Sequence, residues 1–173
     1  MKNISTQKYI IRTAAQLGSV AVITALDVLF KNIALEKLSG KGLVTVIPHF
    51  IGLYYCENTG AAFSMFSSST SALSYVTLAA IAAVTVWLCL PKIRPLAYDI
   101  IVPAIIAGGL GNLIDRFSRG YVIDYIATLF IDFPVFNFAD CFITCGCIAL
   151  LIYTVYDAVC EAKKKKKTDD TIQ

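Results

Sequence analysis

The stretch Ser71-Ala-Leu-Ser-Tyr-Val-Thr-Leu-Ala-Ala-Ile-Ala-Ala-Val-Thr-Val-Trp-Leu-Cys-Leu90 holds twenty residues and no charged side chain. An α-helix rises about 1.5 Å per residue, so a helix of this length crosses the roughly 30 Å of hydrocarbon in a bilayer. Three further apolar stretches have a comparable length, at about 10–30, 96–113 and 136–159. The sequence therefore predicts four transmembrane helices, with these four ranges as their bounds.

The composition of the whole chain also indicates a membrane protein. Of its 173 residues, 57% are hydrophobic and 16% are charged, whereas soluble domains are about 45–50% apolar and about 25% charged. Four spans leave too few residues for a separate soluble core. We therefore predict a mainly α membrane protein that forms a single integral membrane domain over residues 1–173.

The segment over about 40–66 differs from the helices on either side of it. Leu43-Val-Thr-Val-Ile47 and Phe50-Ile-Gly-Leu-Tyr-Tyr55 are rich in β-branched and aromatic residues, with Pro48 between them and Asn58-Thr-Gly60 after them. Such runs, bounded by turn residues, are typical of short strands. We predict two or three strands that form a small extracytoplasmic β-sheet, amphipathic enough to lie on the bilayer surface.

The rest of the chain outside the spans is predicted to be loop. Two long segments, about 31–70 and 114–135, are expected to be non-helical, and the second of them is a second outer loop. A polar loop over 64–70 is expected to lead into the second span. Gly108-Gly-Leu-Gly111 is expected to end the third span, and we interpret these glycines as close helix packing rather than as a phosphate-binding loop.

Lysine and arginine are distributed unequally between the two ends of the spans. Ten of the fifteen lie in the N-terminal tail, in the turn between the second and third spans, and in the tail over 160–173. The other five lie at the opposite ends, at Lys31, Lys37, Lys41, Arg116 and Arg119. Because basic residues are enriched on the cytoplasmic side, both termini are predicted to be cytoplasmic and the two loop segments to face outward.

Each terminal stretch has an alternative interpretation. The basic start and the first apolar run resemble a secretory signal peptide, but the run is longer than the usual apolar core of such a peptide, so we interpret it as an uncleaved first span. The run Lys163–Lys167 is interpreted as an orientation signal within a solvated, frayed cytoplasmic tail. The same lysines could also rest on anionic lipid.

Two carboxylates stand out because their surroundings are apolar. Asp124, in Gly120-Tyr-Val-Ile-Asp-Tyr-Ile126, and Asp140, in Phe136-Asn-Phe-Ala-Asp-Cys141, are 16 residues apart. A carboxylate at the centre of a membrane helix costs roughly 2.5–3.5 kcal/mol on insertion scales. Two carboxyl groups in one site of low dielectric can share a proton, the state in which aspartic proteases activate water. We therefore expect this pair to be central to the function.

Further polar residues are expected at the same outer level of the membrane. Asp27 and Lys31 are four residues apart on one helix and are placed to pair. The other members of the group are Asn58, Asn112, Asp115, Arg116 and Asn137. The group is larger than the packing of four helices requires, which favours a functional site.

Neither a metal nor a cofactor is expected. Six cysteines are present, but their spacing matches no zinc pair, and the one histidine, His49, is remote from them in sequence. Cysteines within an apolar helix behave as small hydrophobic residues. His49 is interpreted as a side chain at the membrane interface.

Four sequence blocks, taken in order, resemble those of a known family. They are Asn58-Thr-Gly-Ala-Ala-Phe63, Gly111-Asn-Leu-Ile-Asp-Arg116, Val122-Ile-Asp-Tyr125 and Phe136-Asn-Phe-Ala-Asp140. The chain from about residue 25 to residue 146 is similar to lipoprotein signal peptidase, the bacterial type II signal peptidase. That family is a four-span aspartic protease of the bacterial cytoplasmic (inner) membrane. It removes the signal peptide of prolipoproteins immediately before a cysteine that carries diacylglycerol.

The resemblance implies a role for each matched residue. Asp124 and Asp140 would be the catalytic dyad. The residues that would bind substrate are Asn58, Gly60, Asn112, Arg116 and Asn137. The supporting residues would be Asp27, Lys31 and Asp115, with Asp115 orienting Arg116 or the loop.

The resemblance also implies the partners of the chain, which are diacylglyceryl-modified prolipoprotein signal peptides, membrane lipid and globomycin-type peptide inhibitors. No nucleic acid is expected. The active site would lie near the extracytoplasmic face. Two positions depart from the family pattern: Val28 stands where the family has Gln, and Glu57 precedes Asn58 where a basic or neutral residue is expected.

Other classes of membrane protein fit the sequence less well. Small four-helix exporters place a single Glu near the middle of the first span, whereas here Gln16 is mid-way and Asp27 lies at the outer end. A non-catalytic scaffold leaves the aspartate pair unexplained. An intramembrane protease of the presenilin type would carry a Gly-x-Gly-Asp motif, which is absent from this sequence.

Overall fold

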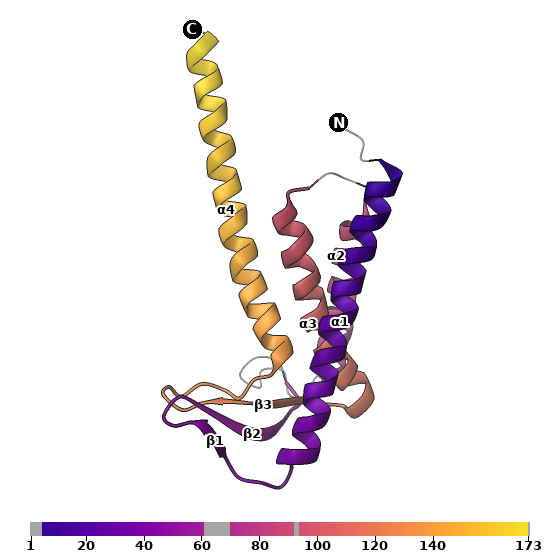
Figure 1. Ribbon diagram of the computed structural model, residues 1–173, viewed down its shortest axis with the longest axis vertical. Helices are drawn as coiled ribbons and strands as arrows, with labels where there is room; N and C mark the ends of the chain where they lie inside the picture. Colours follow the sequence, from indigo (N-terminus) through magenta and orange to yellow (C-terminus); the bar gives the residue numbers. More distant parts are fainter. Residues whose placement is uncertain (1–4, 61–69, 92–93, 173) are drawn as a thin grey trace.

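The structure is a computed structural model that describes residues 5–60, 70–91 and 94–172. The elements follow in the order α1 (Thr6–Leu38), β1 (Val44–Ile47), β2 (Ile51–Asn58), α2 (Thr70–Cys89), α3 (Leu96–Arg119), β3 (Val122–Thr128) and α4 (Phe138–Ile172). The helices run along the long axis of the molecule, and the sheet lies across one end of the bundle, opposite the end where both termini lie (Figure 1). The polar loop predicted over 64–70 lies almost entirely outside the described residues.

The prediction of a mainly α membrane protein with a small sheet is confirmed. Within the described residues, three helical segments are long and apolar enough to cross a membrane: Thr6–Leu38, Leu96–Arg119 and Phe138–Lys164. The fourth predicted span, α2, provides a shorter apolar stretch over Ser74–Cys89. The whole helix holds 20 residues (Thr70–Cys89), which at about 1.5 Å per residue is long enough to cross a hydrocarbon core.

Three helices continue beyond the predicted ends of their spans. α1 runs to Leu38 rather than to Phe30, because Ala34 and Leu38 pack against Ile123 and Tyr125 of β3. α3 runs to Arg119, so the Gly108–Gly111 run lies inside this helix and not at its end. α4 continues to Ile172, so the tail that was expected to be frayed is helical. Segments 31–38 and 114–119, expected to be non-helical, are therefore helix.

The end of α3 is set by a glycine. Gly120 adopts a left-handed conformation with φ 84°, and its backbone N–H donates to the carbonyl of Arg116 at 3.1 Å. Glycine is the usual residue at this position because it has no Cβ to clash. The chain leaves the helix here and enters β3, which carries Asp124.

The sheet has three antiparallel strands in the order β1-β2-β3. The sequence placed all of its strands within 40–66, but the third strand comes from the second outer segment. Cys56 of β2 is paired with Asp124 of β3. Because side chains alternate across a strand, Ile123 and Tyr125 share one face and pack with α1 residues, and Asp124 projects to the opposite face.

Close packing around α3 brings the helices together at the level of the predicted site. A Cβ on Gly108 would lie 2.5 Å from the carbonyl oxygen of Ala139 on α4. A Cβ on Gly111 would collide with the carboxylate of Asp27 on α1. The interpretation of these glycines as packing positions is confirmed, and their effect is to bring α1 and α4 against the part of α3 that carries Asn112.

Candidate active site

The predicted site residues converge where α1, α3 and the start of α4 meet strands β2 and β3. Asp124 is 2% exposed and Asn137 is fully buried, whereas Asp140 remains partly exposed. Each carboxylate comes from a different element, Asp124 from β3 and Asp140 from the first turn of α4. Hydrogen bonds between side chains link the two.

Asn137 and Asp140 cap the N-terminus of α4. The side-chain Oδ1 of Asn137 accepts from the backbone N–H of Asp140 at 3.0 Å, and Oδ2 of Asp140 accepts from the backbone N–H of Asn137 at 3.1 Å. This reciprocal pair is a capping box, which satisfies two backbone donors that a helix start leaves free. It fixes the carboxylate of Asp140 relative to the helix start.

Asp124 is held by two amide side chains. The Nδ2 of Asn137 donates to Oδ1 of Asp124 at 2.6 Å, and the Nδ2 of Asn58 donates to its Oδ2 at 2.9 Å. The Oδ1 of Asn58 in turn accepts from the backbone N–H of Gly60 at 2.9 Å. Burial raises the pKa of Asp124 to about 6, with the hydrogen bond from Asn58 opposing this rise and the charge of Asp140 adding to it.

Asn112 completes the link between the two carboxylates. Its Nδ2 donates to Oδ1 of Asp140 at 2.8 Å, and its Oδ1 accepts from Nδ2 of Asn137 at 3.1 Å. The same Oδ1 accepts from the ammonium group of Lys31 at 2.8 Å. Asn112 therefore connects the carboxylate pair to a buried cation.

Lys31 and Asp27 form the ion pair that their spacing predicted. Their Nζ and Oδ2 atoms are 2.7 Å apart, and both side chains are fully buried. The other oxygen of Asp27, Oδ1, accepts from the backbone N–H of Ala139 at 2.9 Å. A buried ion pair needs such further partners, because the desolvation of two charges is costly. The pair ties α1 to the start of α4.

Asp115 orients the chain around β3. It lies 3.4 Å from Nζ of Lys31 and accepts from the backbone N–H of Ile123 at 3.1 Å and from Nε of Arg119 at 3.2 Å. Of the two alternatives left open by the sequence, these bonds favour the loop over Arg116. They hold the end of α3 against the residue that precedes Asp124.

Arg116 contacts the turn that follows β2. Its Nη2 donates to the carbonyl oxygen of Gly60 at 2.9 Å, and the amide N–H of the same glycine donates to Asn58. The guanidinium group interacts electrostatically with Asp140 and, less strongly, with Asp124. Arg116 is thus joined to Asp124 through two backbone groups and one amide side chain.

Three parts of this network were not predicted from the sequence. Arg119 bonds to Asp115 and also donates to Oδ1 of Asn32 at 2.6 Å. The i, i+4 spacing of Asp115 and Arg119 is a local signal that identifies this pair. The backbone donors of Ile123 and Ala139 have no such signal, because they reach carboxylates on distant segments.

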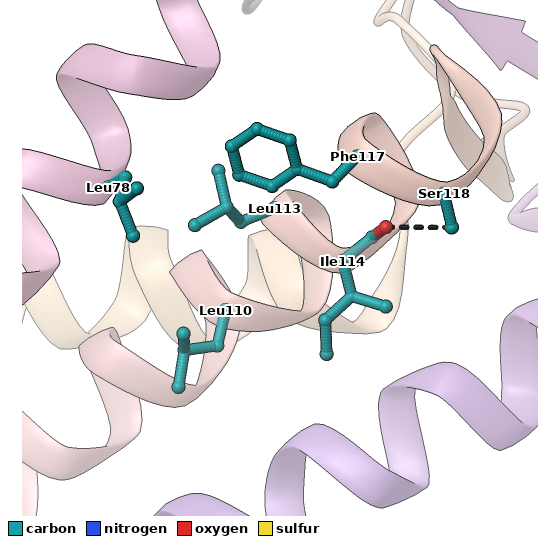
Figure 2. Close-up of a pocket in the computed structure, with 6 residues that line it drawn as sticks. All are labelled: Leu78, Leu110, Leu113, Ile114, Phe117 and Ser118. Atoms are coloured by element: carbon teal, nitrogen blue, oxygen red, sulfur yellow. Dashed lines mark hydrogen bonds between the residues drawn. The ribbon is translucent and has the colours of Figure 1, made fainter.

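Two pockets on the described helix surface are apolar, and neither is lined by the carboxylates. One, of about 410 Å³, lies between α2 and α3 and is lined by Leu78, Leu110, Leu113, Ile114, Phe117 and Ser118 (Figure 2). The hydroxyl of Ser118 donates to the carbonyl of Ile114 at 2.7 Å and so has a partner. The other pocket lies on α1 and α3 and includes Val28, so the departure from the family pattern at this position lines an apolar surface.

No cluster suited to a metal is found in the described part of the chain. Within residues 5–60, 70–91 and 94–172, no group of three or more His, Cys, Asp or Glu side chains is placed to hold an ion. His49 is exposed in the turn between β1 and β2.

Comparison with known proteins gives the family of this chain. The model of the family described as signal peptidase (SPase) II matches residues 19–156. The chain belongs to the signal peptidase II family. This membership confirms the resemblance drawn from the four sequence blocks, and with it a peptidase in a bacterial membrane. The exporter and scaffold alternatives are thereby set aside.

Individual lipoprotein signal peptidases are also similar to this chain. The lipoprotein signal peptidase of Parasynechococcus marenigrum is 34% identical over 143 residues, which cover 83% of this chain and 90% of the relative. The lipoprotein signal peptidase of Streptococcus pneumoniae is 35% identical over 134 residues, covering 77% and 87%.

A solved structure shares the fold of the signal peptidase II chain. It is a bacterial membrane enzyme determined by the in meso method at 2.3 Å resolution. It superposes with a TM-score of 0.74 at 27% identity, covering 91% of this chain and 93% of the other.

Proposed function

We propose that this signal peptidase is an aspartic endopeptidase that cleaves prolipoproteins immediately before the diacylglyceryl-modified cysteine, with Asp124 and Asp140 as its catalytic dyad. The observation that carries the proposal is the position of Asn137. Its side chain donates to Asp124 at 2.6 Å, and its backbone N–H donates to Asp140 at 3.1 Å. One residue thus holds both carboxylates in a fixed relation, as a dyad that acts on a single water requires.

The charges around the two aspartates support a shared proton. Four carboxyl groups belong to the hydrogen-bonded cluster, and the basic side chains that belong to it are Lys31, Arg116 and Arg119. With four possible negative charges against three positive ones, a single proton on the dyad makes the cluster neutral. A neutral cluster is favoured in surroundings of low dielectric.

The chemistry is general acid–base catalysis by the pair. The ionised carboxylate takes a proton from a water, whose oxygen attacks the carbonyl carbon of the scissile peptide bond. The protonated carboxyl gives its proton to the carbonyl oxygen, forming a tetrahedral diol. The first carboxyl then protonates the amine as the C–N bond breaks, and the diol returns a proton to the second, which restores the starting state.

The proposed substrate-binding residues divide by the hydrogen bonds they already make. The amides of Asn58, Asn112 and Asn137 hold the dyad, and a peptide would bind against these three side chains. Arg116 and Gly60 lie beyond Asn58 and would contact the peptide backbone or the lipid ester carbonyls. Arg116 has a planar fork of donors suited to such oxygens. We propose Asp27, Lys31 and Asp115 as the supporting residues.

The orientation completes the proposal. We propose one integral membrane domain with both termini in the cytoplasm and the dyad near the extracytoplasmic face. The exposed apolar side chains of the sheet and of its β1–β2 turn, among them Val46, Ile47 and Phe50, support its contact with the membrane surface. The signal helix would lie among the spans with the acyl chains in lipid, and globomycin-type peptides would occupy the same place. A reporter fused after Gln173 that faces the cell exterior would contradict this orientation.

The test is cleavage of a synthetic diacylated prolipoprotein peptide by the purified protein in detergent. We expect mass spectrometry to place the cut directly before the lipidated cysteine, and an unlipidated peptide to be cut poorly. Asp124→Asn and Asp140→Asn should each retain less than a few per cent of wild-type turnover, a loss of at least about 30-fold. The matched control is Asp132→Asn, an exposed aspartate between β3 and α4, which should cleave normally. Substantial cleavage by either dyad variant would remove that residue from the catalytic role.

A further inference from the structure

The buried lysine of the site has a specific arrangement of partners. Lys31 is fully buried, and its ammonium nitrogen lies 2.7 Å from Oδ2 of Asp27, 2.8 Å from Oδ1 of Asn112 and 3.4 Å from Oδ2 of Asp115. An ammonium group can donate three hydrogen bonds and can accept none. Three partners therefore use its whole donor capacity, and Asn112 is the only uncharged one of the three.

This arrangement decides which way the amide of Asn112 points. Because Lys31 can only donate, the atom of Asn112 that faces it has to be the carbonyl oxygen. The NH2 group then faces the other way and donates to Oδ1 of Asp140 at 2.8 Å. Hydrogen bonds in such a chain polarise one another, so the positive charge of Lys31 favours negative charge on Asp140.

The remaining donors around Asp140 act in the same direction. Its Oδ2 accepts from the backbone N–H of Asn137 at the start of α4, where the helix dipole favours an anion. Arg116 on α3 also interacts electrostatically more strongly with Asp140 than with Asp124.

Asp124 has different surroundings. Both of its oxygens accept from amides, those of Asn58 and Asn137. These two amides are oriented by the backbone N–H groups of Gly60 and Asp140, and neither bonds directly to a cation. Lys31 lowers the pKa of Asp124 only through a charge interaction, which is weaker than the effects of burial, of the two amides and of Asp140. Burial raises the pKa of this carboxyl to about 6.

The other titratable groups near the dyad do not change this balance. Cys56 on β2 and Tyr125 on β3 lie close enough to interact with the aspartates. Burial raises the pKa of both groups, so both are uncharged at neutral pH. Asp27 and Asp115 are paired with Lys31, and Cys141 follows Asp140 on α4.

We propose that Lys31 is a positioning residue that orients Asn112 and so makes Asp140 the charged member of the dyad, with the proton on Asp124. In the reaction, Asp140 then takes the proton of the attacking water, and Asp124 gives its proton to the carbonyl oxygen of the substrate. The assignment of acid and base rests on the proposed function. The distribution of charge in the resting protein does not depend on the proposed function, and it can be measured without substrate.

The first experiment is an infrared titration of the detergent-solubilised protein without substrate, following the band of protonated carboxyl groups. Wild type should show a component with a midpoint at about pH 6. Asp124→Asn should lose it, and Asp140→Asn should keep it at a lower midpoint because the neighbouring charge is gone. Asp99→Asn, near the far end of α3, is the matched control and should leave it unchanged. Loss of the component in Asp140→Asn, or its survival in both dyad variants, would overturn the proposal.

The second experiment tests Lys31 through the pH dependence of kcat/KM on the diacylated peptide. Without the positive charge, the ionised form of Asp140 is less favoured, so the acid limb of the profile should move to higher pH by about one unit in Lys31→Met. Lys31→Arg keeps the charge and should keep the limb in place. Where Lys31→Met does not fold, Asn112→Leu breaks the same relay and leaves the ion pairs of Lys31 intact. A purely structural role would lower the rate without moving the limb, and that result would overturn the role of Lys31.

The two proposals fail in different ways. If the chain cuts the diacylated peptide by a mechanism that is not aspartic, both dyad variants cleave it as wild type does, whatever the infrared titration gives. If only the assignment within the dyad is wrong, cleavage is still lost in both variants while the carboxyl component follows Asp140.

Discussion

The two ends of the helix bundle both contain buried polar clusters, but the clusters differ in the groups that hold their carboxylates. At the end near the termini, Arg12 pairs with Asp99 at 2.8 Å, and Gln16 donates to the same carboxylate at 2.8 Å. Arg94 donates to the carbonyls of Trp87, Leu88 and Leu90 at the end of α2. This cluster ties α1 to α3 and caps a helix.

At the other end, the same types of side chain form a larger network with an excess of carboxyl groups. Asp27 and Asp115 have Lys31 and Arg119 as ionic partners, whereas Asp124 and Asp140 are held mainly by amides. Amides position a carboxylate without neutralising it. The comparison teaches that the proposed reactive carboxylates of this protein are those held mainly by amides, whereas the other buried carboxylates are paired with cations.

The largest difference between the two ends should be in catalysis. Arg116→Ala removes the guanidinium from the turn at Gly60 and should lower kcat/KM on the diacylated peptide by about 100-fold. Arg116→Lys keeps the charge but loses the planar fork, so its loss should be smaller.

The control for this prediction is Arg94→Ala at the other end. It removes a helix cap and should lower the melting temperature while leaving kcat/KM of the folded protein unchanged. Equal losses of kcat/KM in Arg94→Ala and Arg116→Ala would mean that the two clusters do not differ in function.

The next largest difference should be in stability. Asp27→Asn leaves Lys31 short of one ionic partner in a fully buried site and should lower the free energy of unfolding by about 3–5 kcal/mol. Asp99→Asn affects a pair whose side chains are 15% and 14% exposed and keeps an oxygen that can accept from Arg12 and Gln16, so its cost should be smaller, about 2 kcal/mol. Thermal unfolding of both variants in the same detergent measures the difference. A larger loss for Asp99→Asn would reverse the comparison.

A smaller effect concerns the pH dependence. A dyad that works with one proton loses activity when that proton is lost, so kcat/KM should fall as the pH rises through about 6, the pKa of Asp124. The hydrogen bond from Asn58 stabilises the charged form and lowers this pKa. Asn58→Leu should therefore move the alkaline limb to higher pH, and Gln16→Leu at the other end should leave it in place. A shift to lower pH in Asn58→Leu would contradict the role of this bond.

The smallest effect expected is that of chelation. The proposed aspartic dyad uses no metal, so EDTA should leave the rate of cleavage unchanged, both in wild type and in the variants at either end. Loss of activity that zinc restores would replace the aspartic mechanism with a metal-dependent one.

Local patterns predicted those parts of the molecule that depend on neighbours in sequence. The ion pair of Asp27 and Lys31 follows from their i, i+4 spacing, and the apolar runs gave the helices. The capping box of Asn137 and Asp140 also has a sequence signature, a capping residue followed three positions later by an acidic one. That signature is present at Asn137-Phe-Ala-Asp140.

The remaining features depend on contacts between distant segments. β3 pairs with β2 although the paired residues are 64 to 77 positions apart in sequence, and a local pattern does not identify the partner of a strand. The continuation of α1 to Leu38 depends on packing against β3. Asn112 is a single amide in an apolar helix, and two of its partners, Lys31 and Asp140, come from the first and last helices. Its role requires the assembled fold.

The capping box at the start of α4 has a consequence for how the enzyme responds to heat. Helix ends open and close far more readily than helix centres, and here the group that closes the end, Asp140, is a proposed catalytic group. Each fraying event of the first turn would silence the enzyme for its duration, while the rest of the bundle stayed intact. Heat inactivation should therefore begin reversibly, below the temperature at which the bundle melts. The loss of turnover would then report the opening of this single helical turn.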